Sequence, residues 1–241
     1  MLDGRSTSAA LGGARIETAV FGIGAIEQHG RHLPIATDWT QVKEISRRVA
    51  EALGALLLPA IPFSMSECHG PMGGTVWLKP ATLSAVLRDV AASLRSQGVR
   101  RLLVLNGHGG NFILEPTIQA LNQAYPALRV VMPAEVWAPV PGAEPIFSAP
   151  VAGIHAEEIE TSMQLFLNPE HVTGERVDYA PPVGREFLDY AFMPLISPDG
   201  VWGYASYGEA WKGEAAIAAQ VQSVVAFTRH AFARLDDVYQ R

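Results

Sequence analysis

The sequence predicts a single three-layer α/β/α domain, spanning residues 1–241, around a mainly parallel sheet. Short apolar runs rich in Val, Leu and Ile alternate with longer amphipathic segments, a rhythm typical of a parallel sheet covered by helices on both faces. In addition, 49% of the residues are hydrophobic and 17% are charged, so the chain can bury one large core. No repeat or shift in composition marks a second domain.

Four apolar runs are the expected strands of this sheet. Each is short and bounded by residues that favour turns or helix starts. In parallel sheets, ligands bind at the carboxyl ends of the strands, so we expect the functional site in the loops that follow these runs. The runs are 18–24 (TAVFGIG), 55–63 (ALLLPAIPF), 100–107 (RRLLVLNG) and 128–134 (LRVVMPA).

Five amphipathic segments between and after the runs are the expected helices. In residues 38–53, Val42, Ile45 and Val49 recur at helical spacing, and Gly54 is a suitable C-terminal stop. This segment would therefore lay one apolar face on the sheet. The other expected helices span 82–97, about 112–125, about 155–167 and about 214–241.

Composition and charge argue against several classes of function. The 18 basic and 24 acidic residues give a net charge of −6, and no Lys/Arg-rich run is present, so we expect no nucleic-acid partner. No apolar stretch approaches the length of a membrane span, and we expect no membrane partner. Cys68 is the one cysteine, and the first twenty residues lack the pattern of a signal peptide. We therefore expect a cytoplasmic protein.

Four potential cation ligands, Glu27, His29, His32 and Asp38, lie in the stretch GAIEQHGRHLPIATD, residues 24–38. If the chain is extended there, the i, i+2 spacing places Glu27 and His29 on one face. Burial would penalise each group unless it were paired, and a mixed His and carboxylate set favours Zn²⁺, Fe²⁺ or Mn²⁺. Two simpler interpretations remain open: Asp38 as a helix N-cap, and Glu27 with His29 as a buried pair.

A second cluster, LVLNGHGGN at residues 103–111, places His108 between glycines at the end of an expected strand. Glycines let a ligand or metal approach the backbone closely. A phosphate-binding loop is the alternative, but the segment has no Lys and does not match the usual glycine-rich motifs. We therefore favour His108 as a site residue, although a structural histidine would fit the same pattern.

A third cluster, GIHAEEIETSMQL at residues 153–165, contains His155, Glu157, Glu158 and Glu160. On a helix, His155 and Glu158 are i, i+3 neighbours, as are Glu157 and Glu160, so no single face carries all four. Acidic residues also occur at ordinary helix starts, where they interact favourably with the helix dipole. This cluster alone does not decide between the two interpretations.

Taken together, the three clusters resemble the creatininase family of metal-dependent amidohydrolases. The matching segments GAIEQHGRHLPIATD, LNGHGGN and HAEEIETS follow the family order, and GTVWLKPATL and GVWGYASYGEAWKGEAA resemble its weaker signatures. The resemblance covers nearly the whole chain. It implies a three-layer α/β fold, a two-metal site at the carboxyl edge of the sheet, and a homo-oligomer, with a hexamer favoured.

The resemblance also implies a set of metal ligands. Glu27 and His108 would hold one ion and His29 the other, with Asp38 bridging both. These would be two divalent ions of Zn, Fe or Mn per subunit. His32 would support the ligands rather than bind, and His69 would lie in a loop beside the pocket.

The last metal ligand is assigned to Glu158. The creatinine-hydrolysing branch carries a glutamate where this chain has Gly110, whereas branches with the plain NGHGGN loop have one in the third motif, at Glu158. Glu160, in the Glu-Thr-Ser shared by all branches, is expected to support a neighbouring group. Glu157 stands where the family usually has Gly, so Glu157 and Glu160 remain alternatives for this position.

The implied activity is hydrolysis of a C–N amide bond by a metal-bridging hydroxide. His155 is the candidate acid that protonates the leaving nitrogen, and Glu158 is the second candidate catalytic residue. The expected partner is a small-molecule amide, either a formamide or a cyclic amide. Creatinine itself fits less well, because creatinine-specific members have an aromatic residue where this chain has Gly109.

Other functions remain open. Within the family, one alternative is a peptidase that trims a redox-cofactor precursor peptide, and another is a creatinine amidohydrolase proper. Outside it, the chain could be a non-catalytic metal-binding protein, or a metal-free hydrolase that uses Ser66 or Ser162. The last alternative is weak because no GxSxG motif occurs.

Overall fold

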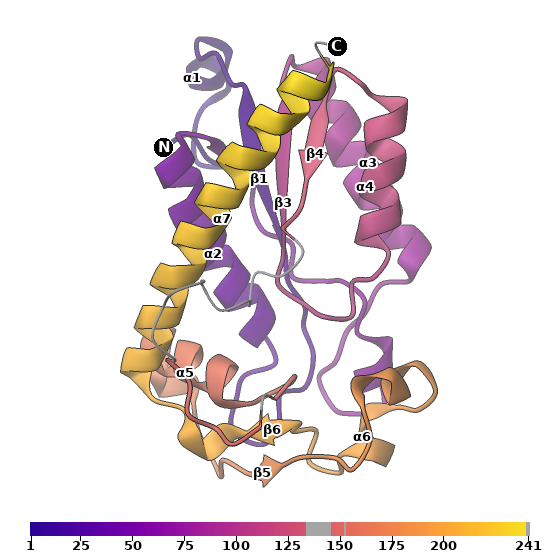
Figure 1. Cartoon of the computed structure of the whole chain (residues 1–241), viewed down its shortest axis with the longest axis vertical. Helices are drawn as coiled ribbons and strands as arrows, with labels where there is room; N and C mark the ends of the chain where they lie inside the picture. The colour runs from indigo at the N-terminus through magenta and orange to yellow at the C-terminus, as the bar shows by residue number, and fades with distance from the viewer. Residues whose placement is uncertain (134–145, 152, 240–241) are drawn as a thin grey trace.

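The structure, a computed structural model, describes residues 1–133, 146–151 and 153–239 (Figure 1). Its centre is a sheet in which each neighbouring pair of strands is parallel. The predicted α/β fold class with a mainly parallel sheet is therefore confirmed. In spatial order the strands are β2 (Leu56–Leu57), β1 (Thr18–Ile23), β3 (Arg101–Asn106) and β4 (Arg129–Val131).

The central strands are covered on both faces. Along β3, Leu102 and Val104 belong to one buried cluster, whereas Leu103 and Leu105 belong to another, as the two-residue period of a strand requires. Helices pack on both sides and complete the three layers (Figure 1). One face is covered by α3 (Pro80–Ser96) and α4 (Leu114–Ala124), and the other by α2 (Thr37–Leu53), α5 (Glu158–Leu167) and α7 (Ala210–Tyr239).

One expected strand is much shorter than its apolar run. Within residues 55–63 only Leu56–Leu57 pairs as a strand. Pro59 and Pro62 have no backbone N–H to donate to a neighbouring strand, so the continuous pairing stops at Leu57 and resumes only as an isolated bridge between Ile23 and Ile61.

Two helix starts also differ from the prediction. The fourth helix begins at Glu158 rather than near residue 155, because Ala156 adopts a left-handed conformation with φ of 51°. The last helix begins earlier than expected, at Ala210. Residue 134 of the fourth expected strand and residues 240–241 of the last helix lie outside the described residues.

The strands lead toward the lower end of the molecule in Figure 1, where β5 (Asp178–Tyr179), β6 (Gly203–Tyr204) and α6 (Met193–Ile196) lie beneath the sheet, whereas α1 (Ser8–Gly12) lies at the upper end. At the lower end an antiparallel pair forms between short segments far apart in sequence. The remaining elements are the 3-10 turns Glu67–His69, Pro169–His171, Arg185–Asp189 and Ala205–Tyr207.

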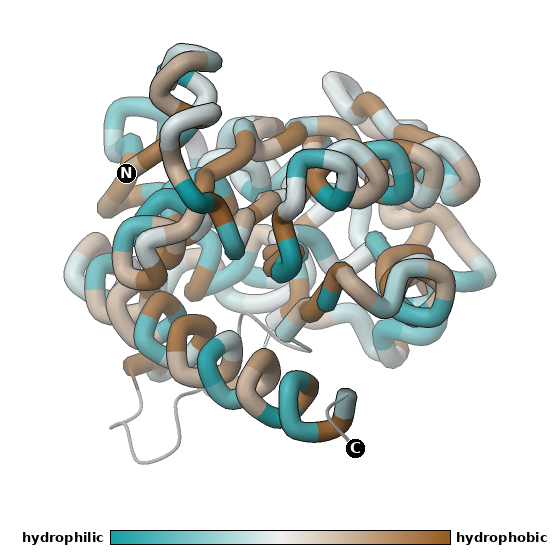
Figure 2. The backbone as a smooth tube through the Cα atoms, turned by 90° about the horizontal axis from the view of Figure 1, so that it is seen from above, coloured by the Kyte–Doolittle hydropathy of each residue, from teal (hydrophilic) through white to brown (hydrophobic). Residues whose placement is uncertain are grey.

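The helices are amphipathic, as expected for a layer that covers a sheet. Seen from above, hydrophilic and hydrophobic residues alternate along their turns (Figure 2). Within the described ranges, no helix combines the length and the apolar character needed to cross a membrane.

Candidate metal centre

Glycines at the ends of the two central strands let the start of α2 approach the loops that carry the site. A side chain at Gly24, just after β1, would meet the backbone of Trp39. A Cβ at Gly107, just after β3, would lie 2.6 Å from the Cβ of Val42. Because α2 is held so close, Asp38 in its first turn faces the residues that follow β1 and β3.

Four of the expected metal ligands meet at this position, and all are buried: Glu27, His29, Asp38 and His108. The Asp38 carboxylate lies between two histidines, with Oδ1 3.1 Å from His29 Nε2 and Oδ2 2.9 Å from His108 Nδ1. Glu27 Oε2 lies 3.3 Å from His108 Nε2. The N-cap position of α2 belongs to Ala36, so Asp38 does not serve as the helix cap.

Hydrogen bonds to backbone carbonyls determine which nitrogen of each histidine carries a proton. A carbonyl oxygen only accepts, so the ring nitrogen facing it is the N–H. The other nitrogen of each ring faces the carboxylates, and it can bind a cation when it carries no proton, the usual arrangement of a metal-binding histidine and its supporting carbonyl. The pairs are His29 Nδ1 with Glu27 O (3.0 Å), His108 Nε2 with Met65 O (2.7 Å) and His155 Nε2 with Gln28 O (2.8 Å).

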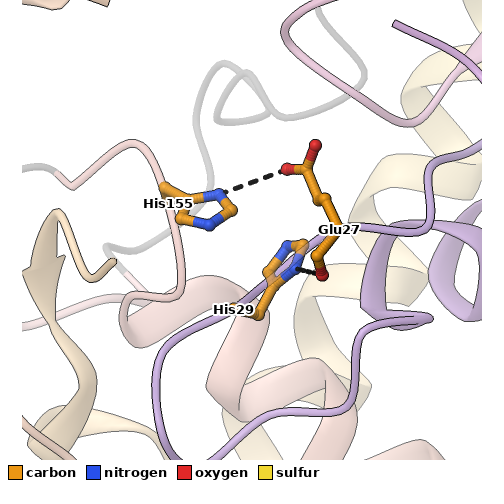
Figure 3. A group of neighbouring side chains, drawn as sticks. All are labelled: Glu27, His29 and His155. Atoms are coloured by element: carbon orange, nitrogen blue, oxygen red, sulfur yellow. Dashed lines mark hydrogen bonds and ion pairs between the residues drawn. The ribbon is translucent and has the colours of Figure 1, made fainter. Parts of the chain in front are cut away.

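Glu160 is a fifth candidate ligand of the cluster, with Oε2 3.6 Å from His29 Nε2. Among the described residues, three groups of three side chains bring ligand atoms within 4.8 Å of one another. Asp38 belongs to two of these groups, as a bridging carboxylate would. The groups are Glu27, Asp38 and His108; His29, Asp38 and Glu160; and Glu27, His29 and His155, the last drawn in Figure 3.

The carboxylates of this centre lack the partners that buried charges need. Both oxygens of Glu27 and Oδ2 of Asp38 are buried and have no hydrogen-bond partner among the described residues. An uncompensated buried carboxylate is costly, and a bound cation would offset that cost. The donor set and its unpartnered oxygens therefore fit one or more divalent ions.

The pKa values show how strongly these groups act on each other. Burial raises the pKa of Glu27 to about 7, and the negative charge of Asp38 adds to the shift. For Asp38, burial is outweighed by the positive field of His29, by the hydrogen bond between His29 and Oδ1 and by the nearby His108, which together hold its pKa below the usual range. Burial lowers the pKa of His108, but Glu27 and Asp38 outweigh it and raise the value to about 9. A cation at this position would compete with these protons.

Glu158 lies elsewhere, although its side chain is also buried. Its Oε1 is 2.7 Å from Lys212 Nζ, and its oxygens accept hydrogen bonds from the N–H groups of Ser148 (2.9 Å) and Ala149 (2.7 Å). Because α5 begins at Glu158, residues 158 and 160 point in directions about 200° apart. The structure thus brings Glu160, and not the expected Glu158, to the other ligands.

Glu157, the other alternative, caps α5. Its carboxylate accepts hydrogen bonds from the backbone N–H groups of Ile159 (2.9 Å) and Glu160 (3.3 Å). Burial, with a contribution from the charge of Glu160, raises the pKa of Glu157 to about 8. Its oxygens are therefore directed at the helix start rather than at the metal ligands.

The remaining histidines divide between the centre and its surroundings. His155 joins the centre, with Nδ1 3.5 Å from Glu27 Oε1 (Figure 3). His32 instead contacts Thr161 Oγ1 at 2.9 Å and belongs to none of the three ligand groups. His69 lies closer than the sequence indicated: its ring centroid is 4.5 Å from that of His155, and its Nε2 is 3.8 Å from Glu27 Oε1. The signal was its position after the second apolar run, at the same sheet edge as the other loops.

Comparison with known proteins decides the family. A family model described as creatinine amidohydrolase matches residues 5–228 of the chain. The chain belongs to the creatininase family. Members of this family are hydrolases, and the buried histidines and carboxylates of the present chain are suited to bind metal.

Two curated relatives differ in the activity their names describe. The mycofactocin precursor peptide peptidase of Mycobacterium tuberculosis strain H37Rv is 32% identical over 222 residues, which cover 86% of this chain and 82% of the relative. The creatinine amidohydrolase of Pseudomonas putida is 29% identical over 228 residues, covering 87% of this chain and 88% of the relative. The family thus includes enzymes named for a peptide and for a small cyclic compound.

Solved structures share the fold closely. A putative creatinine amidohydrolase from Bacteroides fragilis is 26% identical with a TM-score of 0.77, covering 94% of each chain. A creatininase variant described as Zn-Zn type is 25% identical with a TM-score of 0.78, covering 89% of this chain and 90% of that one. A structure described as creatininase Mn is 24% identical with a TM-score of 0.81. The match covers 95% of this chain and 97% of that one, and it supports the fold.

Proposed function

We propose that the protein is a metal-dependent amidohydrolase that uses two divalent ions to cleave a C–N amide bond. The observation that carries this proposal is the position of Asp38. Its carboxylate lies between His29 and His108, and each ring donates to a backbone carbonyl through one nitrogen and turns the other toward the carboxylate, where that nitrogen can bind an ion once it has lost its proton. A shared carboxylate between two ligand groups is the arrangement expected of a two-metal centre.

The residues that would hold the ions follow from the ligand groups. Glu27, Asp38 and His108 would bind one ion. His29, Asp38 and Glu160 would bind the other, so that Glu160 takes the role that the sequence assigned to Glu158. Mixed imidazole and carboxylate ligands suit Zn²⁺, Fe²⁺ and Mn²⁺, and the solved relatives described as Zn-Zn type and Mn support the first and last of these.

Side chains of the protein would transfer the protons of the reaction. When bound, divalent ions lower the pKa of a water and polarise a carbonyl oxygen. His155 directs its proton-free Nδ1 at the centre, where it can take a proton from the attacking water and return it to the leaving nitrogen. Glu158 does not reach the reacting atoms, because Lys212 and two backbone N–H groups hold its carboxylate.

The proposed substrate is a small amide, either a formamide or a cyclic amide. Gly109 next to the loop histidine provides no aromatic surface, a feature that argues against creatinine itself. A second candidate is trimming of a precursor peptide. It is favoured by the relative named a peptide peptidase, which is 32% identical over 86% of this chain.

Metal analysis combined with amide assays tests the proposal. Protein purified without added metal would be analysed for its metal content and assayed on formamides, cyclic amides and peptides, with and without a chelator. We expect about two ions per chain and cleavage that chelation abolishes and Zn²⁺ or Mn²⁺ restores. Activity in metal-free protein would contradict the metal-dependent mechanism. Bound metal without turnover on any of the amides would indicate a non-catalytic metal-binding protein.

A further inference from the structure

Gln28 lies between Glu27 and His29 in the sequence, but its side chain extends to a different group of residues. It is buried, with 5% of its surface exposed. Its amide nitrogen Nε2 lies 2.8 Å from His69 Nδ1 and 3.1 Å from the carbonyl oxygen of Gly200. The chain thus places, next to two ligands of the candidate centre, a residue that contacts a histidine without an assigned role.

The orientation of the Gln28 amide is determined by the backbone. The N–H of Gly30 can only donate, so the atom 3.0 Å from it is the amide oxygen. The carbonyl of Gly200 can only accept, so the atom 3.1 Å from it is the NH₂ group. Gly200 has a positive φ of 72°, and a Cβ there would lie 2.5 Å from Gln28 Cδ, so the absence of a side chain at Gly200 leaves room for this arrangement.

This orientation determines the protonation of His69. One hydrogen of the Gln28 NH₂ group is donated to Gly200, and the other points at His69 Nδ1. Nδ1 must therefore accept, which leaves the ring proton on Nε2. That nitrogen lies 3.8 Å from Glu27 Oε1, so His69 directs an N–H at the candidate centre.

The backbone of Gln28 determines the protonation of His155. His155 Nε2 is 2.8 Å from the carbonyl oxygen of Gln28, and two lone pairs facing each other at that distance would repel. The proton therefore lies on Nε2, and the 2.9 Å contact of this nitrogen with the Gln28 NH₂ group is not a hydrogen bond. Nδ1, without a proton, is 3.5 Å from Glu27 Oε1.

We propose that Gln28 is a positioning residue that holds both His69 and His155 as their Nε2–H tautomers, with opposite nitrogens facing the centre. The centre then meets a hydrogen-bond donor, His69 Nε2, and a proton acceptor, His155 Nδ1. This inference rests on the proposed amide hydrolysis for its catalytic meaning. As water adds to the carbonyl carbon, its proton passes to His155 and then to the nitrogen released when the C–N bond breaks. The His69 N–H keeps its proton and stabilises negative charge beside the reacting carbonyl.

Nitrogen NMR of ¹⁵N-labelled histidine tests the tautomers directly, in metal-free and zinc-loaded protein. Signals would be assigned with His69→Gln and His155→Gln variants. In the wild-type chain we expect the Nε2–H pattern for both rings. An Nδ1–H pattern for His69 in the wild-type chain would overturn the inference, whether or not the protein hydrolyses amides.

Gln28→Glu separates the two effects of this residue. The variant replaces the donating NH₂ group with an accepting oxygen but keeps the backbone carbonyl. We therefore expect a proton to appear on Nδ1 of His69, while His155 keeps its Nε2–H pattern and serves as the internal control. An unchanged His69 pattern in Gln28→Glu would contradict the proposal.

Gln28→Met provides a second variant of similar size that neither donates nor accepts. We expect it to release His69 into a mixture of tautomers and to leave His155 unchanged. With an amide substrate, both variants should lower kcat about 10- to 100-fold with little change in KM and unchanged metal content, as for other residues that support a metal site. Failure of amide cleavage in the wild type would refute the proposed function, whereas unaltered tautomers and kcat in both variants would refute the role of Gln28 alone.

Discussion

Two buried acidic regions lie close together at the carboxyl edge of the sheet and are neutralised in different ways. Glu158 has a partner within the chain, since Lys212 Nζ lies 2.7 Å from its Oε1 and backbone N–H groups complete its hydrogen bonds. Among the described residues, the ion pairs of Glu27 and Asp38 are all with histidines, and three of their four carboxylate oxygens lack a hydrogen-bond partner.

The difference shows that the partners of a buried carboxylate distinguish a structural role from a metal-binding one. A carboxylate whose charge and hydrogen bonds are satisfied by the chain, as for Glu158, has no capacity left for a metal ion. Carboxylates that face histidines and have oxygens without a hydrogen-bond partner can still bind an external cation, which would replace the histidine protons. We therefore expect substitutions in the first region to affect stability, and substitutions in the second region to affect metal binding and activity.

The largest effect is expected from Asp38→Asn. The amide keeps the size of the side chain but removes the charge shared by both ligand groups. We expect loss of bound metal and a fall in amidohydrolase activity of at least about a thousandfold, because catalysis of this type depends on the bound ions. Metal analysis and steady-state assays measure both quantities.

Glu158→Gln is the matched control for this substitution, since it makes the same chemical change in the other region. It should keep the metal content of the wild type. If Glu158→Gln lost its metal and Asp38→Asn kept it, the assignment of the two regions would have to be reversed.

The next effect is on stability and is expected from Lys212→Met. The substitution leaves the Glu158 carboxylate buried without its cation, and breaking a buried pair in this way costs about 3–5 kcal/mol of unfolding free energy. Urea titration measures the change. The metal content of the folded fraction should stay at the wild-type value, and a loss of metal without a loss of stability would argue against the structural role of this pair.

A smaller effect is expected when the metal is removed from the wild-type chain. Ligands that bind only the folded state stabilise it, by about 2.7 kcal/mol when the free concentration is a hundred times the Kd. For a chain of this size, chelation should lower Tm by about 5 °C or more. Thermal unfolding with and without chelator should show this shift in Glu158→Gln but not in Asp38→Asn. Equal shifts in the two variants would indicate that the chelator acts elsewhere.

The sequence predicted the layers of the fold because burial on both faces leaves a clear pattern. The two central strands, 18–23 and 101–106, appear as uninterrupted apolar runs, and the helices as amphipathic segments between them. The continuous strand in the second run is shorter than its hydrophobicity suggested, since prolines interrupt the pairing and leave an isolated bridge at Ile61. Hydrophobic pattern therefore located the elements, whereas their limits depended on individual backbone groups.

The candidate ligands near strand ends were also accessible to prediction. Glu27 and His29 follow one central strand, and His108 lies in the glycine-rich loop after the other. The structure brings these residues together with Asp38, although their binding of metal stays a prediction.

The sequence did not allow a choice between Glu158 and Glu160 as the last candidate ligand. The choice depends on the residue at which α5 begins and on Lys212, which lies 54 positions away on α7. A contact between helices that are distant in the sequence leaves no local pattern. The contact of His69 with Gln28 was hidden for a similar reason, since the two residues are 41 positions apart.

The smallest effect on stability is expected from combining Lys212→Met with Glu158→Gln. This double variant is also the sharpest test of the difference between the two acidic regions. The double variant removes both charges, while the glutamine oxygen can still accept from the N–H of Ser148. Because replacing both members of a buried ion pair is often neutral, its unfolding free energy should lie within about 2 kcal/mol of the wild type and above that of Lys212→Met alone. Urea titrations of the wild type, both single variants and the double variant give the coupling energy. If the losses of the two single variants simply added up in the double variant, the pair would not act as a unit. The charge of Glu158 would then be offset by a group other than Lys212.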